Sequence, residues 1–371
     1  MAWLSNATTA ESFLQAVVEH NLTRSQRVFF EKYYTHFVAY GVLAGSFCLA
    51  EFFLSAICFT AILTYPPLKR KFNYLIANMV VINLLLSSTV YPLNIYGNLR
   101  ALYGELPARF CDWTVYSFFI INAGIWHECV IAIDRYLAIV HSTHYPFIRG
   151  KKGVAFTIIA GYVPAVLLNL YPLVAANDEF IAAPPFGDCV LNPRKPEISQ
   201  FVEIRAILGL YLPSVLTGLS YAAIFAFFMT RRFRVGVAQP SPASDQAVQA
   251  NVKQARRMRV ALLLFLIFLW SLMGNLPLPL IDAFYRDLFR QYPPAYFFPR
   301  YATQFSIVGS KVIYAMLNPD YRAGVRAVWL CRFGQDGLRG RRRRNNRVQL
   351  PRPAAGTAPV APINLGARCE A

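Results

Sequence analysis

Seven long stretches of mostly apolar residues, separated by short polar connections, constrain the fold of this chain more than any other feature. A helix needs about 20 such residues to cross the hydrocarbon core of a bilayer. Within the bilayer the backbone must satisfy its own hydrogen bonds, which favours helices for these segments. The sequence therefore predicts an all-α membrane protein. The expected spans are residues 36–63, 72–96, 113–140, 154–174, 201–230, 256–281 and 297–317.

The composition agrees with a lipid environment and argues against a soluble protein. Hydrophobic residues make up 56% of the chain, charged residues 15%, and the mean hydropathy is +0.36. A soluble domain carries roughly a quarter of charged residues, so this chain has too little polar surface to cover a core in water. The net charge of +18 does not indicate nucleic-acid binding, because the basic residues gather beside the apolar stretches and at 341–344 and form no nucleic-acid-binding motif.

The charge of the connections predicts the orientation of the chain. Lys and Arg accumulate on the cytoplasmic side of membrane proteins because they resist translocation. The first, third and fifth connections are strongly basic, whereas those on the other side mix few basic residues with acidic ones. We therefore expect a multi-pass protein of the plasma membrane with an extracellular N-terminus. Glycosylation sequons at Asn6 and Asn21 precede the first span and agree with this orientation.

The inner end of the third expected span carries the most specific motif in the chain. Asp134-Arg135-Tyr136 is followed there by the sequence LAIVHSTHYP. This string resembles the DRY motif of rhodopsin-like (class A) G-protein-coupled receptors, together with the start of their second cytoplasmic loop. The resemblance implies a seven-transmembrane helix bundle with a short amphipathic eighth helix. Its implied partners are an extracellular ligand, a heterotrimeric G protein and the lipid bilayer.

Further positions extend the resemblance along the chain. Asn78 begins a stretch similar to the second-span NLxxxD pattern, and Pro213 with Tyr221 is similar to the fifth-span pattern. The residues from 318 onwards resemble the start of the eighth helix. The resemblance also implies a disulfide between Cys111, before the third span, and Cys189, in the second outer loop.

The resemblance divides the chain into four parts. They are an extracellular glycosylated N-terminus at 1–35, the seven-transmembrane bundle at 36–317, the amphipathic eighth helix at 318–333 and a disordered basic cytoplasmic tail at 334–371. The connection at 236–251, which is rich in Pro, Ser and Ala, is also expected to be disordered. Cys331, near the end of the eighth helix, is the expected palmitoylation site.

Several family positions hold other residues, which indicates a divergent member, of peptide-receptor or invertebrate-like type. Trp270 matches the sixth-span switch Trp, but the Pro expected two residues later is Leu272, and Pro277 leaves a second alignment open. The other departures are Asn83 for the sodium-binding Asp, Ser310-Lys311-Val312-Ile313-Tyr314 for NPxxY, Ser55 for the first-span Asn, and Gly161-Tyr162 for the fourth-span Trp.

The resemblance assigns a role to the residues of the motif. In the family, activation moves the sixth helix outward, and the motif Arg leaves its neighbouring Asp to join two Tyr residues and the G protein. The implied coupling switch comprises Asp134, Arg135, Tyr136, Tyr221 and Tyr314, with Trp270 as the toggle.

Three charged residues, Glu51, Glu128 and Lys311, lie deep inside expected spans and away from the Asp134 motif, where charge is expensive and usually marks function or pairing. Glu128 precedes Arg135 by two helical turns and should face the bundle interior. Our hypothesis is that Lys311 pairs with Glu51 or Glu128, and that its ammonium replaces the sodium ion of relatives. With Asn83 and Ser310, these residues form an expected intramembrane polar cluster. The alternative is that each charge snorkels to the membrane surface or stays neutral.

The expected ligand site lies at the outer end of the bundle. The third-span face that carries an amine-binding Asp in many relatives holds Ser117, Phe118 and Ile121 here, which disfavours an amine. Gln304 stands where opsins carry the retinal Lys, which disfavours an opsin. Arg205 and Asn275 are further candidates for ligand contact. We favour a neuropeptide-like ligand, followed by a small chemosensory molecule.

Two other classes of function remain open. A transporter or channel could use Glu51, Glu128 and Lys311 as a relay, but it would leave the Asp134-Arg135-Tyr136 string unexplained. A receptor-like protein that is uncoupled or constitutively active fits the altered seventh span. No catalytic motif stands in any span, and no cofactor or metal site is expected.

Overall fold

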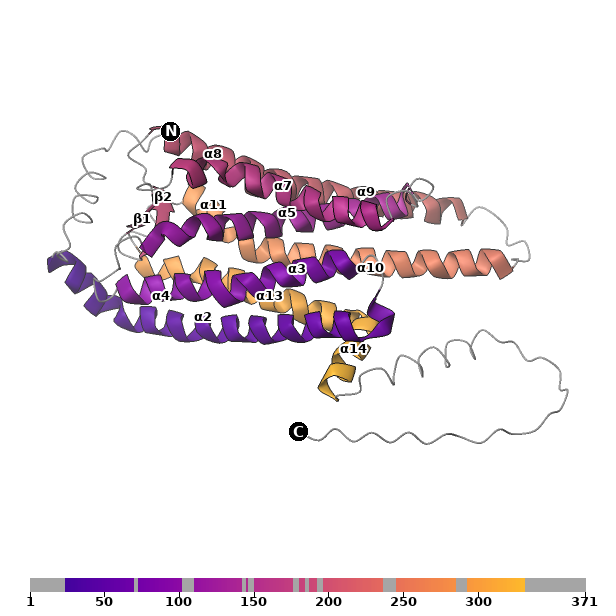
Figure 1. The fold of residues 1–371 in the computed structure, drawn as a ribbon, viewed down its shortest axis with the longest axis horizontal. Helices are drawn as coiled ribbons and strands as arrows, with labels where there is room; N and C mark the ends of the chain where they lie inside the picture. The colour runs from indigo at the N-terminus through magenta and orange to yellow at the C-terminus, as the bar shows by residue number, and fades with distance from the viewer. Residues whose placement is uncertain are drawn as a thin grey trace.

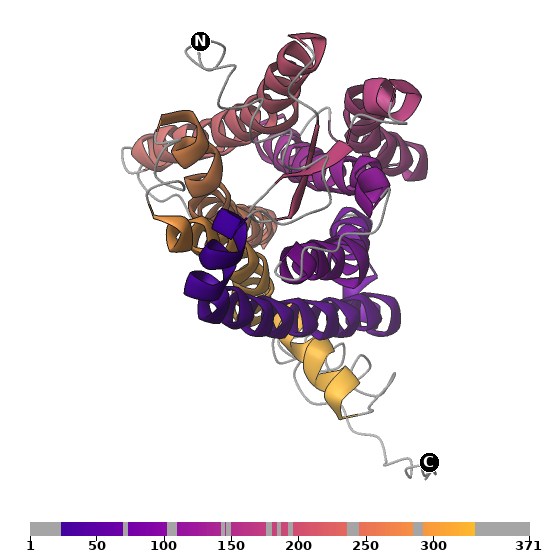
Figure 2. The same cartoon turned by 90° about the vertical axis from the view of Figure 1, so that its left-hand side faces the viewer.

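Long helices that run side by side account for most of the structure (Figure 1). The computed structural model describes residues 24–69, 73–101, 110–141, 145, 150–175, 180–183, 187–191, 196–235, 245–284 and 292–330. Seen from one end, the helices form a closed ring (Figure 2). The helices are α2 (Arg24–Thr64), α3 (Asn73–Leu85) with α4 (Tyr91–Ala101), α5 (Thr114–Ile139), α7 (Lys151–Ala175), α8 (Pro196–Ala206) with α9 (Leu212–Val235), α10 (Asp245–Asn275) with α11 (Pro277–Phe284), α13 (Phe297–Leu317) and α14 (Pro319–Trp329).

Six of the seven helical rods are long and apolar enough to cross a membrane by themselves. The seventh, α13, has the same bounds as the expected span, but Arg300, Gln304 and Lys311 make it more polar. Two other helices exceed the sequence-based expectation. α2 begins at Arg24, inside the part expected to be a separate N-terminus, and α10 begins at Asp245, inside the connection expected to be disordered. Ala, Gln, Lys and Arg are strong helix formers, which explains the early start of α10.

Prolines distort three of the rods. A π-helical turn at Leu86–Val90 joins α3 to α4, and another at Ile207–Tyr211 joins α8 to α9. Each turn ends two residues before a proline, Pro92 or Pro213, which has no N–H to bond the preceding turn. The sixth rod breaks between α10 and α11, directly before Pro277. The break therefore lies further along the rod than Leu272, the position expected from the family.

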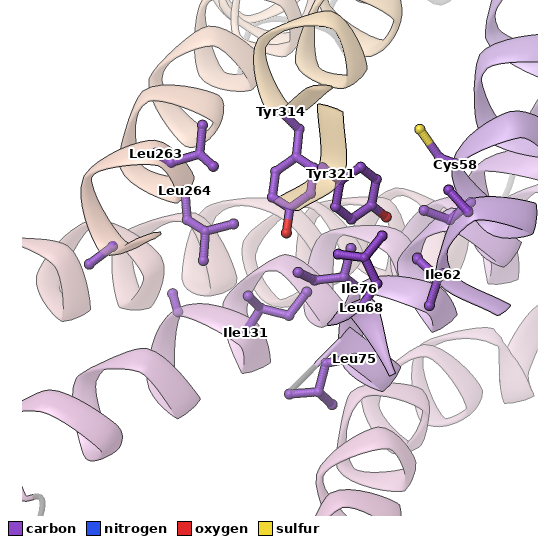
Figure 3. Packing of buried hydrophobic residues seen from close by; sticks show 14 of the residues in the cluster. Cys58, Ile62, Leu68, Leu75, Ile76, Ile131, Leu263, Leu264, Tyr314 and Tyr321 are labelled. Carbon is purple, nitrogen blue, oxygen red and sulfur yellow. The ribbon is translucent and has the colours of Figure 1, made fainter. Parts of the chain in front are cut away.

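The half of the bundle next to α14 is held by a buried hydrophobic cluster (Figure 3). Tyr314 of α13 and Tyr321 of α14 meet edge to face, with ring centroids 4.4 Å apart. Figure 3 shows both rings surrounded by aliphatic side chains from the other helices, among them Leu68, Ile131 and Leu264. Since α14 supplies Tyr321 to this cluster, the end of α13 and the start of α14 are fixed to the bundle.

The sequence of α14 explains why it forms a separate helix. The side chain of Asn318 accepts hydrogen bonds from the backbone N–H groups of Asp320 and Tyr321, and Pro319 occupies the first helical position. Both are favoured at helix starts. Tyr321 is buried on one face while Arg322 and Arg326 are exposed, so the helix is amphipathic. α14 leaves the end of the bundle at an angle to α13 (Figure 1).

A short antiparallel hairpin lies across the other end of the bundle (Figure 2). Strand β1 (Phe180–Ala183) pairs with β2 (Asp188–Leu191), with Ala183 opposite Asp188. Gly187 has φ of 73°, and a Cβ there would lie 2.6 Å from the Gly97 carbonyl oxygen, so only glycine suits this position. The disulfide between Cys111 and Cys189 ties β2 to the start of the third rod.

Two polar contacts also hold the hairpin to the helices. The carboxylate of Asp188 forms an ion pair with Arg300 of α13 and accepts a hydrogen bond from Asn98 of α4 at 3.2 Å. The Arg300 guanidinium lies over the ring of Tyr296, 4.3 Å from its centre. The hairpin therefore connects the second, third and seventh rods at the end of the bundle opposite α14.

The fourth rod is anchored by contacts that compensate for the missing family Trp. The Tyr162 hydroxyl donates to Asn78 Oδ1 at 3.0 Å. The ring of His127 stacks edge to face against Tyr162 and fills the space next to Gly161. A Cβ on Gly161 would lie 2.8 Å from this imidazole, so α5 and α7 pack closely because position 161 has no side chain.

Candidate functional site

The C-terminal end of α5 carries a closed network of charge and hydrogen bonds. Arg135 forms an ion pair with the neighbouring Asp134. The Tyr145 hydroxyl donates to Asp134 Oδ1 at 3.1 Å and accepts from Arg135 Nη2 at 3.3 Å. Asp134 is buried, so both partners stabilise its charge. Tyr136 points elsewhere, with its hydroxyl 3.1 Å from His141 Nε2. Arg135 is thus held by its own helix and by the segment that follows it.

Next to this network lies a cavity of about 120 Å³. Its lining includes Tyr221 and Tyr314 together with Asn83, Glu128, Ser310 and Lys311. The volume is enough for several water molecules. The structure therefore brings the two expected partner tyrosines of Arg135 and most of the expected polar cluster to one space. Neither tyrosine hydroxyl is recorded in a hydrogen bond with Arg135, which pairs with Asp134 instead.

A buried ion pair crosses from the seventh rod to the first. Lys311 Nζ lies 3.1 Å from Glu51 Oε1, and the Ser55 hydroxyl donates to the same oxygen at 2.8 Å. The Glu51 side chain is 2% exposed and that of Lys311 11%. Glu128 lines the cavity but makes no ion pair in the described part of the chain. Of the two carboxylates considered from sequence, the structure thus places Glu51 against Lys311.

Trp270 joins α10 to α13. Its indole Nε1 donates to the Ser306 carbonyl at 2.9 Å, and its ring lies 5.5 Å from that of Phe305. Gly309, one turn further along α13, faces the indole without a side chain. The toggle candidate is therefore bonded directly to the helix that carries Lys311 and Tyr314.

The residues expected to contact a ligand differ in burial and in their bonding partners. Ser117 and Gln304 are buried, and Gln304 Oε1 has no hydrogen-bond partner among the described residues. The Arg205 guanidinium lies over the Phe118 ring, 3.5 Å from its centre. Asn275 turns back to Ser271 of its own helix. Ile121 is more than one third exposed.

Some residues lie outside the described part of the chain, and others were missed from sequence. Asn6, Asn21 and Cys331 belong to the first group. Tyr145 was missed, although it stands within the string that carries the resemblance. The pairing of Asp188 with Arg300 was missed as well, because no local pattern links residues so far apart in sequence.

Burial raises the pKa of the Tyr321 phenol, so its hydroxyl stays protonated.

Comparison with known proteins decides the family. Residues 55–319, the greater part of the chain, match the family described as "7 transmembrane receptor (rhodopsin family)". The chain belongs to this family. The receptor is therefore a multi-pass membrane protein and no enzyme, and the resemblance inferred from the Asp134 motif is confirmed. Among the described residues, no group of three or more His, Cys, Asp or Glu side chains could hold a metal ion.

Individual relatives are about one quarter identical to the receptor over the residues that align with it. It is 26% identical to the human Alpha-1D adrenergic receptor over 57% of this chain and 37% of that protein. Identity to mouse 5-hydroxytryptamine receptor 1D is 28%, over 51% of this chain and 50% of that protein. Identity to mouse Trace amine-associated receptor 9 is 24%, over 78% and 84%. The chain thus spans half or less of the first two relatives.

A solved structure supports the fold independently. The crystal structure of squid rhodopsin superposes on 85% of this chain and 92% of its own, with a TM-score of 0.66 and 15% sequence identity. The expected seven-transmembrane bundle is therefore confirmed.

Proposed function

We propose that this receptor binds an extracellular ligand and activates a heterotrimeric G protein through Asp134, Arg135 and Tyr136. In this proposal it lies in the plasma membrane with its N-terminus outside. The closed network of Arg135 with Asp134 and Tyr145 carries the proposal. A guanidinium at the inner end of a bundle is available to a cytoplasmic partner only when its own carboxylate releases it. The network is thus the resting state of the switch.

The tyrosines along the cavity supply the second state. Tyr221 and Tyr314 line the cavity next to the network, on the fifth and seventh rods. The hydroxyl of Tyr314 has no hydrogen-bond partner in the described part of the chain. A buried hydroxyl without a partner is unfavourable, so a rearrangement that hydrates it or brings Arg135 to it is favoured. Outward movement of α10 would open the cavity and permit this change.

The core of the receptor carries its own cation. A sodium ion, which relatives of this family bind in the same region, does not suit the donors here, because Asn83 is neutral and Lys311 places an ammonium in the cavity. We infer that Lys311 takes the place of the ion and links α13 to α2 through Glu51. Thermal unfolding of the purified receptor should then be equal in sodium chloride and choline chloride of the same concentration.

The ligand is proposed to be neuropeptide-like. Ser117 provides no negative charge for an amine, and the polar side chains at the outer end come from several rods. The relatives named above are receptors for amines by their names, so an amine is the competing ligand. Activation of the wild-type receptor by an amine would contradict this proposal, whether or not Ser117→Ala changes the response.

The coupling proposal is tested by basal second-messenger output in cells, measured as cyclic AMP and calcium at matched surface level. Asp134→Asn removes the carboxylate that holds Arg135 and should raise the output several-fold. Arg135→Ala should lower it to background, also when combined with Asp134→Asn. Lys152→Ala, an exposed cation at the inner end of α7, is the control and should behave as wild type. Equal output from the wild type and all four variants would instead indicate an uncoupled receptor.

A further inference from the structure

One cation at the outer end of the bundle has no anionic partner among the described residues. Arg205 lies in the last turn of α8, and its guanidinium stacks on Phe118 of α5. The Phe118 ring in turn lies 5.8 Å from that of Phe180, the first residue of β1. Arg205 is half-buried, and Glu203 on the same helix is exposed to the surroundings. In the described part of the chain, no carboxylate and no hydrogen-bond acceptor is recorded for its guanidinium.

Other cations among the described residues are bonded to oxygen atoms. Arg300 pairs with Asp188 beneath the hairpin, and Lys311 pairs with Glu51 in the core. Arg100 donates from Nε to the Tyr96 hydroxyl at 3.0 Å. The chain therefore supplies oxygen ligands to its other inward cations but only a ring face to Arg205. A ring face offsets a small part of the cost of removing a guanidinium from water, so this charge is left poorly compensated.

The stacking fixes the guanidinium for recognition of a planar anion. One face of the group is covered by Phe118, so its N–H donors point sideways in a rigid fork. This fork matches the two oxygens of a carboxylate. Lysine would give a point charge without this geometry, and it would lose the flat contact with the ring.

We propose that Arg205 and Phe118 form a subsite for a carboxylate of the ligand. The inference rests on the proposed receptor function and specifies the chemistry of the ligand: an acidic group next to an apolar or aromatic one, which packs against Phe118 and Phe180. The C-terminus of a peptide and an acidic side chain share this chemistry.

The test uses the purified full-length receptor and follows thermal unfolding. The probes are N-acetylphenylalanine, which has a free carboxylate, and N-acetylphenylalanine amide, which has the same ring and no charge. The acid should stabilise the wild type at millimolar concentration while the amide should not. In Arg205→Gln the apparent affinity for the acid should fall by about tenfold or more, as expected for loss of a charge-assisted hydrogen-bond pair. Arg205→Lys should retain an intermediate affinity.

Two controls separate a ligand subsite from internal pairing. Arg100→Gln removes an outer cation that already has its own partner, and it should leave the effect of the acid unchanged. Glu179→Gln neutralises the carboxylate next to Phe180 in sequence, and it should not imitate Arg205→Gln. If Arg205 belongs to a ligand subsite, its uncompensated charge destabilises the receptor when no ligand is bound. Without probe, Arg205→Gln should therefore unfold at the same temperature as the wild type or at a higher one.

The proposal fails if the acid and the amide protect the wild type equally, or if protection by the acid survives in Arg205→Gln. These readouts do not involve G proteins, so they remain valid if the coupling experiment with Arg135 fails. Should Arg205→Gln not fold, the comparison of acid with amide in the wild type and in Arg205→Lys still decides. A free dipeptide and its C-terminal amide then distinguish a peptide terminus from an acidic side chain.

Discussion

At the scale of single residues, departures from the family pattern occur as compensated sets. The fourth-span Trp is replaced by Gly161 and Tyr162. His127 of the third rod fills the space that Gly161 leaves. The Tyr162 hydroxyl bonds Asn78, which gives the second rod a polar partner. Buried polar groups need such partners, so a change at one of these positions requires the others.

Tyr162→Phe should therefore destabilise the receptor. The substitution keeps the ring that stacks on His127 but leaves Asn78 Oδ1 without its donor. Loss of one buried neutral hydrogen bond costs about 1 kcal/mol. We expect the midpoint of thermal unfolding in detergent to fall by about 2 °C. Tyr171→Phe, on the same helix, is the control, because the Tyr171 hydroxyl makes no hydrogen bond in the described residues. A drop of equal size in both variants would contradict the role of Asn78.

The ion pair of Lys311 predicts unequal effects of two similar substitutions. Glu51→Gln leaves the Lys311 ammonium without its carboxylate in the membrane core, which costs about 3 kcal/mol for a buried pair. Glu128→Gln breaks no ion pair and should cost much less. Thermal unfolding of both variants at one protein concentration measures the difference.

Charge reversal tests the same pair in the opposite direction. Lys311→Glu combined with Glu51→Lys should recover part of the stability and surface expression that either single change removes. The matching exchange with Glu128→Lys should recover less. If neither exchange rescues better than the single changes, pairing of Lys311 with Glu51 does not stabilise the resting receptor.

At the scale of helices, the approach of α10 to α13 depends on two glycines. Gly274 of α10 faces Ser306, and Gly309 of α13 faces Trp270. Two bonds cross the same interface, from Trp270 Nε1 to the Ser306 carbonyl and from the Thr303 hydroxyl to the Gly274 carbonyl. The sixth and seventh rods are therefore coupled along the segment that includes the toggle candidate.

Gly274→Ala should separate these helices. Its Cβ would overlap the Ser306 side chain and lie 2.8 Å from the Ala302 carbonyl oxygen, which is backbone and cannot move alone. We expect a loss of about 2 kcal/mol, typical of overpacking, together with altered basal signalling. Gly218→Ala is the matched control, because nothing lies within 4 Å of its Cβ. Alanine favours helix over glycine by up to about 1 kcal/mol, so this variant should be neutral or stabilised. Equal stability of both variants would contradict close packing at Gly274.

The helices also show what the sequence could predict and what it could not. The length of the apolar stretches predicts the positions of the rods well, because a helix that faces lipid needs an apolar surface. α13, for example, has the bounds expected for 297–317. The starts of α2 at Arg24 and α10 at Asp245 were not predicted, since these ends project beyond the apolar segments, and the length of an apolar segment does not indicate where a polar helix end begins. The choice of Glu51 over Glu128 as partner of Lys311 depends on how three rods pack, which periodicity within one rod does not determine.

At the scale of the whole molecule, α13 connects the outer and inner ends. Its outer turn carries Arg300, which holds the hairpin through Asp188, while its inner half carries Lys311 and Tyr314. A ligand that displaces the hairpin would act on Arg300, and α13 would carry the shift to the cavity. Trp270 follows, since it bonds the backbone of α13. This route links the proposed ligand end with the proposed coupling end.

The composition of the proposed cytoplasmic tail predicts how signalling is terminated. Arrestin capture that depends on receptor phosphorylation needs clustered Ser or Thr, because it reads the added negative charge. Residues 319–371 contain one such residue, Thr357, and are strongly basic around 341–344. The positive charge of the nearby arginines would offset the negative charge of a single phosphate there.

Agonist-driven arrestin recruitment, measured by energy transfer in cells, should therefore be weak and unchanged by Thr357→Ala. Robust recruitment that disappears when residues 334–371 are removed would contradict this, since the tail would then bind arrestin by another means. Recruitment that persists without the tail would place the contact on the bundle itself, next to Arg135.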